Sequence, residues 1–133
     1  MRQTVTYGQP LETEIGFSRA CRVDNVVAVT GTAPIAPDGS VAAPGDLYGQ
    51  TRRSLEIIAD VLAKAGAGLD QVIRTRIFLT DMSRWKEAAR AHGEVFGQIK
   101  PATSFIGTSA LINPGWLVEI EADAVIPTGA PEK

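Results

Sequence analysis

The stretch 72–80, VIRTRIFLT, and the stretch 25–30, NVVAVT, decide the fold class of this chain. Both are rich in β-branched residues, so each predicts a β-strand. Between them, apolar side chains recur at helical spacing over residues 47–65, which predicts an amphipathic helix. Asp46 is expected to cap the start of this helix, and Gly66 is expected to end it.

Further elements lie on either side of this centre. Gly31 is expected to end the strand over 25–30. A second helix is expected with Ser83 as its N-cap and with an apolar side that reaches Phe96. The remaining predictions are strands over 14–23, 103–111 and 116–126, and a loop with tight turns over 34–45. This order of elements predicts an α+β fold with both helices on one face of one sheet.

The length and composition predict a single domain over residues 1–133, with 127–133 as a loose polar tail. The chain has 44% apolar and 21% charged residues, which is typical of a water-soluble globular protein. No apolar segment is long enough to cross a bilayer and the N-terminus lacks a secretory pattern. We therefore expect a cytoplasmic protein that does not associate with membranes.

Charge and residue counts exclude several classes of function. The net charge is -2, whereas a nucleic-acid-binding protein needs a basic surface, so no nucleic-acid partner is expected. The chain has one cysteine, Cys21, and one histidine, His92. A cysteine cluster or a histidine-rich zinc site is therefore excluded, and no metal is expected. His92 is interpreted as a packed, hydrogen-bonded residue and Cys21 as a small buried apolar residue.

The central strands predict a partner for the sheet. Residues 26–29 and 77–79 do not alternate between polar and apolar side chains, so both faces of these strands need to be covered. Two helices can cover only one face. We expect a homo-oligomer in which the uncovered sheet faces meet, and the alternative is that a long loop covers the second face.

Three carboxylates, Glu119, Glu121 and Asp123, leave the same face of the last predicted strand. They could form a solvated strand face, or pair across strands with Arg74 and Arg76. Alternatively, one of them could enter a cleft, where burial raises its pKa and allows it to exchange protons with a ligand.

Five blocks of the sequence, taken in order, resemble the RidA/YjgF family of reactive-intermediate deaminases. The resemblance runs from about residue 14 to residue 126, with the matching blocks at 25–34, 50–67, 72–81, 96–102 and 118–122. It implies a chorismate-mutase-like fold with one mixed sheet, and a homotrimer whose sheets form a central barrel with clefts between subunits. It further implies hydrolysis of imines or enamines to carbonyl compounds, with no metal or organic cofactor.

Part of the family's pocket is kept in this sequence. The pocket glutamate corresponds to Glu119, and the strand-end glycine corresponds to Gly31, with Thr30 before it. By this resemblance, Glu119 positions or deprotonates the attacking water.

Other pocket positions are changed. The family's signature arginine, which binds the substrate carboxylate, corresponds to Thr103, and the signature cysteine corresponds to Phe105. The pocket tyrosine corresponds to Phe17 and the pocket asparagine to Ala89. A neutral threonine cannot make the charge-assisted, two-pronged contact of an arginine, so the usual 2-aminoacrylate activity is in doubt. Arg19 is a candidate substitute cation.

These observations leave two hypotheses of different class. The first is a cofactor-independent hydrolase for a small, mostly apolar imine, enamine or carbonyl compound, held by Thr103 and by backbone N–H groups near Gly31 and Phe105. The second is a trimer that binds a small molecule or acts as a chaperone without catalysis. An endoribonuclease, an activity also attached to the family, fits the acidic balance of the chain less well.

Overall fold

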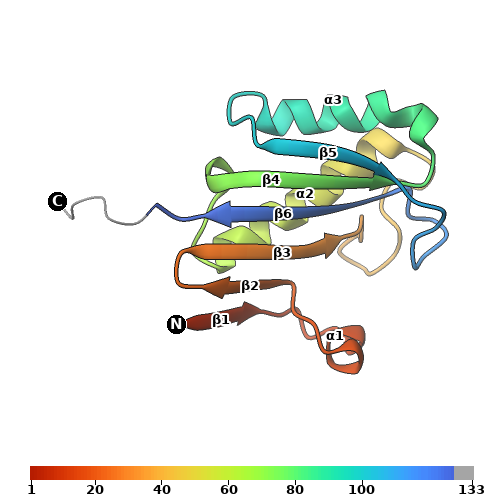
Figure 1. The fold of residues 1–133 in the computed structure, drawn as a ribbon. Helices are drawn as coiled ribbons and strands as arrows, with labels where there is room; N and C mark the ends of the chain where they lie inside the picture. The colour runs from red at the N-terminus through yellow and green to blue at the C-terminus, as the bar shows by residue number, and fades with distance from the viewer. Residues whose placement is uncertain (128–133) are drawn as a thin grey trace.

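The computed structural model describes residues 1–127 and contains one six-stranded mixed sheet (Figure 1). The strands lie in the order β1-β2-β3-β6-β4-β5. The elements are β1 (Arg2–Val5), α1 (Pro10–Ile15), β2 (Ala20–Val23), β3 (Val26–Thr32), α2 (Leu47–Lys64), a 3-10 turn (Leu69–Gln71), β4 (Val72–Leu79), a second 3-10 turn (Met82–Arg84), α3 (Trp85–Phe96), β5 (Ala102–Gly107) and β6 (Val118–Val125). The predicted α+β class is confirmed, and the predicted tail lies outside the described residues except for Pro127.

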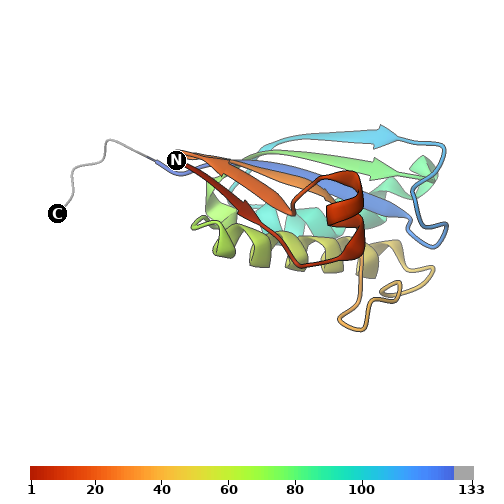
Figure 2. The same ribbon diagram turned by 90° about the horizontal axis from the view of Figure 1, so that it is seen from below.

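The two long helices cover one face of the sheet. Figure 2 shows α2 and α3 on the same side of the strands, as the sequence predicts. The core lies between them and the sheet and includes Ile58 and Leu62 of α2, Ile77 of β4 and Ile120 of β6, which have no exposed surface. Burial of these apolar side chains supplies the main stabilisation of the fold.

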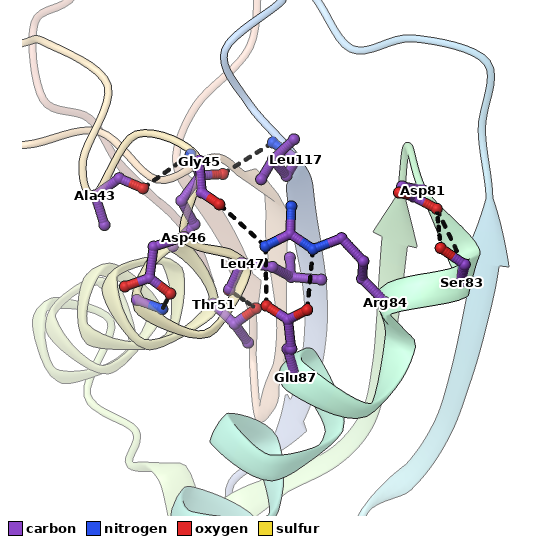
Figure 3. Close-up of polar contacts among 12 residues, drawn as sticks. Ala43, Gly45, Asp46, Leu47, Thr51, Asp81, Ser83, Arg84, Glu87 and Leu117 are labelled. Atoms are coloured by element: carbon purple, nitrogen blue, oxygen red, sulfur yellow. Dashed lines mark hydrogen bonds and ion pairs between the residues drawn. The ribbon is translucent and has the colours of Figure 1, made fainter.

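The start of α2 is fixed by local contacts (Figure 3). The side chain of Asp46 accepts a hydrogen bond from the Gly49 N–H at 3.0 Å, which confirms it as the N-cap. Arg84, just before α3, donates to both carboxylate oxygens of Glu87 at 2.9 Å and to the Gly45 carbonyl at 3.0 Å. The bond from Arg84 to Gly45 joins the beginnings of the two helices.

The sheet pairing explains the mixed topology. β4 and β5 are parallel and α3 connects them, as a strand-helix-strand crossover requires. β6 lies between β3 and β4 and pairs antiparallel with both. The last strand of the chain therefore occupies the centre of the sheet, where its alternate residues Val118, Ile120, Ala122 and Ala124 are buried.

The N-terminal region differs from the prediction. The strand expected over 14–23 is confined to Ala20–Val23, and Pro10–Ile15 is a short helix. Pro10 lies in the first turn of α1, where its missing N–H costs nothing, and Gly16 ends α1 with a φ of 89°. β1 had no counterpart in the prediction and pairs antiparallel with β2.

Smaller differences concern where elements begin and end. β3 continues through Gly31 to Thr32, and a register shift between Val29 and Thr32 marks a β-bulge where the sequence predicted a break. Ser83 does not cap α3, because Asp81 caps the 3-10 turn that precedes this helix. β5 ends at Gly107 rather than at residue 111.

The second face of the sheet is open in the single chain. Burial alternates along β3, so Val27 and Val29 are buried whereas Val26 is 50% exposed and Ala28 is exposed. Phe78 of β4 is half-buried on its outer side. A homotrimer that covers this apolar face stays a prediction.

Candidate active site

A cavity of about 810 Å³ lies between the N-terminal segment, the end of β3 with the loop after it, one side of α2, and the segment before β6. Five of the eight predicted site residues line it: Phe17, Arg19, Thr30, Gly31 and Glu119. These residues come from three separate parts of the chain. The antiparallel pairing of β2 with β3, and of β3 with β6, brings them together.

Glu119 and Gly31 are fitted to each other. Gly31 lies at the bulge of β3, and β6 passes beside it. A Cβ atom on Gly31 would overlap Oε2 of Glu119. Any other residue at position 31 would therefore displace the carboxylate, and the absence of a side chain is what lets Glu119 lie against the strand.

The environment of Glu119 favours its protonated form. Burial raises the pKa of the Glu119 carboxyl, the nearby Glu121 raises it further, and Arg19 opposes both by lowering it. A carboxylate with a raised pKa is a stronger base and accepts a proton more readily than an ordinary glutamate. Glu119 can therefore exchange protons with a ligand in the cavity.

Arg19 is the buried cation of the cavity. Its side chain lies beside the Phe17 ring, with the guanidinium carbon 5.6 Å from the ring centroid. Only 9% of Arg19 is exposed, and Nε has no hydrogen-bond partner among the described residues. Burial lowers the pKa of Arg19, while Glu12, Tyr7 and Glu119 raise it.

The other three predicted site residues lie apart from this cavity in the single chain. The Thr103 hydroxyl is 2.8 Å from the Thr75 hydroxyl, which is also 2.9 Å from Nε2 of His92. Thr103 therefore belongs to a hydrogen-bonded chain that leads under α3. Phe105 packs edge-to-face against Trp85, with the ring centroids 5.9 Å apart, and Ala89 is half-buried on α3.

The structure also shows the contacts of His92 and of the acidic residues on β6. His92 is a packed, hydrogen-bonded residue, as predicted, and burial lowers the pKa of its imidazole. Arg76 lies 3.5 Å from both Glu121 and Asp123, which confirms cross-strand pairing for these two carboxylates. Of the three acidic residues on the open side of β6, only Glu119 lines the cavity and has no such pair.

Several cavity residues were missed in the sequence. Tyr7 donates a short hydrogen bond to Asp60 on α2, and Lys64 contacts the same carboxylate at 2.9 Å. The spacing of Asp60 and Lys64, four residues apart on a helix, signals their pairing. Trp116 and Ile112 line the cavity from the segment before β6, and their sequence carries no signal for that position.

Metal sites can be searched for among the described residues. Over residues 1–127 there is no cluster of three or more His, Cys, Asp or Glu side chains that could hold a metal ion. Over the same range, every helix is too short or too polar to span a bilayer.

Comparisons with known proteins identify the family. The Endoribonuclease L-PSP family model matches residues 8–126. A RutC family protein of Pyrococcus abyssi is 33% identical over 125 residues, which are 93% of this chain and 98% of the relative. The crystal structure of Rv2704 of Mycobacterium tuberculosis, a member of the YjgF/YER057c/UK114 family, is 44% identical, has a TM-score of 0.86, and covers 95% of this chain and 100% of its own.

A more distant structure agrees in fold. The YjgF gene product of E. coli is 23% identical, with a TM-score of 0.76, over 92% of this chain and 91% of its own. The predicted chorismate-mutase-like architecture, with one mixed sheet, is confirmed by these structures. The chain therefore belongs to the RidA/YjgF family, whose family model is named Endoribonuclease L-PSP.

Proposed function

We propose that this protein is a cofactor-independent hydrolase that converts a small imine or enamine into a carbonyl compound. The observation that carries the proposal is Glu119, a half-buried carboxylate with a raised pKa that lines a cavity and has no ion-pair partner among residues 1–127. Phe17 and Trp116 supply apolar walls for the carbon skeleton of the substrate. Membership of the RidA/YjgF family supports the same class of reaction.

The reaction needs one base and one water molecule. Glu119 takes a proton from water as the water oxygen bonds to the imine carbon, and the C=N electron pair moves to nitrogen. Nitrogen then receives that proton from Glu119. In the second half, the hydroxyl proton passes to nitrogen through Glu119, the C–N bond breaks, and the products are a carbonyl compound and an amine or ammonia. An enamine enters by gaining a proton at carbon and losing one from nitrogen, which converts it into the imine.

The complete pocket is proposed to lie between subunits of a homotrimer. In the single chain Thr103, Phe105 and Ala89 are separate from Glu119, and the open sheet face carries exposed apolar side chains such as Val26. A neighbouring copy that covers this face could bring its own Thr103 and Phe105 to the cavity. The proposal includes a cytoplasmic location, where the single thiol of Cys21 stays reduced.

A second candidate is a binding protein without catalysis. The observation that favours it is the change at four pocket positions, which leaves Phe17, Ala89, Thr103 and Phe105 where the family has polar or charged groups. A ligand that raises the melting temperature but is never converted would support this candidate. An endoribonuclease is the least favoured function, and RNA cleavage that disappears in Glu119→Gln would establish it instead.

The experiment compares two acidic residues on the same strand. Imines prepared from a panel of amino acids are supplied to the wild type, to Glu119→Gln and to the control Asp123→Asn, which removes a carboxylate that pairs with Arg76, and carbonyl product is measured. Removal of a general base should lower kcat about 10²–10⁴-fold in Glu119→Gln, while Asp123→Asn retains the wild-type rate. A wild-type rate equal to the uncatalysed rate on every imine would refute the hydrolase.

A further inference from the structure

The charged side chains that line the cavity are paired, with two exceptions. Arg53 lies 3.4 Å from Glu56, and Lys64 lies 2.9 Å from Asp60. Arg19 and Glu119 take part in none of the ion pairs found within 4.0 Å among residues 1–127. The cavity therefore holds one basic and one acidic side chain that form no ion pair within the described residues.

The contrast between the two arginines of the cavity is sharp. Arg53 donates from Nε to the Ile35 carbonyl at 2.7 Å, so its guanidinium is held by the protein. Arg19 is more deeply buried, and its Nε has neither a protein partner nor access to solvent. A buried N–H group without an acceptor costs free energy, because its hydration is lost and not replaced.

Arg19 is also fixed in place by its backbone. Its N–H donates to the Val5 carbonyl at 2.7 Å, and its carbonyl accepts from the Thr30 N–H at 3.0 Å. Glu12 and Glu119 act on it through their charges, but neither forms an ion pair with it within 4.0 Å among residues 1–127. Glu12 instead accepts from the Tyr7 N–H, and Glu119 lies against Gly31. The residue is therefore held on both sides with its side chain in the cavity.

We propose that Arg19 is a carboxylate-binding residue that determines the specificity of the cavity for small anionic ligands. Resting on the proposed function, this inference makes the substrate an imine that carries a carboxylate, with the carboxylate at Arg19 and the reacting carbon toward Glu119. Thr103 cannot supply a positive charge, and Arg19 supplies one from the segment just before β2. The planar guanidinium matches a carboxylate, and loss of water from the site strengthens the contact.

The test measures binding rather than turnover. Dissociation constants of 2-oxobutanoate and of its uncharged analogue 2-oxobutanamide are measured by NMR titration for the wild type, Arg19→Gln and Arg19→Lys. The control is Arg53→Gln, which removes an arginine of the same cavity that already has protein partners. Thermal unfolding by circular dichroism verifies that each variant is folded, and Arg19→Lys keeps the test valid if Arg19→Gln does not fold.

We expect the wild type to prefer the acid over the amide. Arg19→Gln should weaken binding of the acid by at least about tenfold and leave binding of the amide unchanged, because a hydrogen-bonded charge is lost. Arg19→Lys should weaken it less, since the charge stays but the two-pronged geometry is lost. Arg53→Gln should stay within about twofold of the wild type.

Equal binding of the acid by the wild type and Arg19→Gln would overturn the inference, and so would an equal loss in Arg53→Gln. The hydrolase can fail separately. Arg19-dependent binding of the acid without turnover of any imine would refute the hydrolase and leave this inference intact. Turnover of uncharged imines with no preference for the acid would do the reverse.

Discussion

Buried polar groups behave differently in two regions of the molecule, the interior under the helices and the cavity around Glu119. In the interior, Gln50 donates to the Gly115 carbonyl at 3.0 Å and accepts from the Leu117 N–H at 2.8 Å. His92 and Thr75 likewise satisfy each other. In the cavity, Arg19 lacks a partner at Nε, and neither it nor Glu119 forms an ion pair within residues 1–127.

The difference separates polar residues that stabilise the fold from those available to a ligand. A buried polar group with internal partners is part of the structure, and its removal costs stability. A buried charge without partners lowers stability and is retained where something else must bind it. On this basis Gln50, Thr75 and His92 belong to the scaffold, whereas Arg19 and Glu119 belong to the site.

The largest expected effect is the loss of stability when an interior polar side chain loses its hydrogen bonds. Gln50→Leu would remove both hydrogen bonds of this fully buried side chain and leave the Leu117 N–H and the Gly115 carbonyl without it. We expect the free energy of unfolding to fall by about 2–4 kcal/mol, measured by urea denaturation. Gln71→Leu is the control, because Gln71 makes one contact near the surface, to the Gly68 N–H at 3.2 Å. Equal losses in both variants would show that Gln50 has no special role.

The next prediction uses the pH dependence of the interior. Burial lowers the pKa of His92 in the folded state below its unfolded value, so the folded state binds a proton less readily. Stability should therefore fall as the pH drops below about 6.5, and the fall should level off below the folded pKa. His92→Gln should lack this component when unfolding free energies are compared from about pH 8 to about pH 5. Parallel profiles would contradict a neutral, buried imidazole.

The pH dependence of stability that comes from Glu119 in the cavity should have the opposite sign to that from His92. Burial and Glu121 raise the pKa of Glu119 in the folded state, so its stabilising contribution is present at low pH and is lost as the pH rises through the folded pKa. Glu119→Gln should therefore raise the melting temperature at neutral pH, and the gain should disappear in acid. A variant that is less stable than the wild type at neutral pH would indicate that Glu119 has partners within the fold.

The smallest effect is expected at Ser54, an interior polar residue that, unlike Gln50 and His92, has no hydrogen-bond partner for its side chain among the described residues. Ser54 of α2 is fully buried, and its Oγ has no hydrogen-bond partner among the described residues. Unlike Arg19, it does not line the cavity. Ser54→Ala should leave the unfolding free energy unchanged or raise it by up to about 1 kcal/mol, measured by urea denaturation. A loss of more than about 1 kcal/mol would reveal a hydrogen bond to the hydroxyl.

The helices and central strands could be predicted because their signals are local. Asp46 and the apolar spacing over 47–65 determine α2, and the β-branched residues of 72–80 determine β4. α1 also has local signals, Pro10 at its start and Gly16 at its end, and these outweigh the strand-like pattern that begins at residue 14. β1 could not be predicted in the same way, since its pairing with β2 depends on a contact across some 20 residues of chain.

The site was less accessible from the sequence than the fold. Glu119 and Gly31 were predicted by resemblance to the family, and the overlap of a Cβ at position 31 with the carboxylate gives that pairing a physical reason. The burial of the Arg19 guanidinium could not be predicted from its neighbours in sequence. It depends on three strands meeting, with Ala20 opposite Val29 and Val29 opposite Ala122.

The most direct test of the unpaired charges in the cavity is the pKa of Glu119, measured by ¹³C NMR of its side-chain carboxyl in the wild type and in Arg19→Gln. We expect a wild-type pKa above the usual value for glutamate, because burial dominates, and a higher pKa in Arg19→Gln, because Arg19 lowers it. A wild-type pKa at or below the usual value, unmoved by the Arg19 substitution, would contradict the assignment of Glu119 and Arg19 to one site.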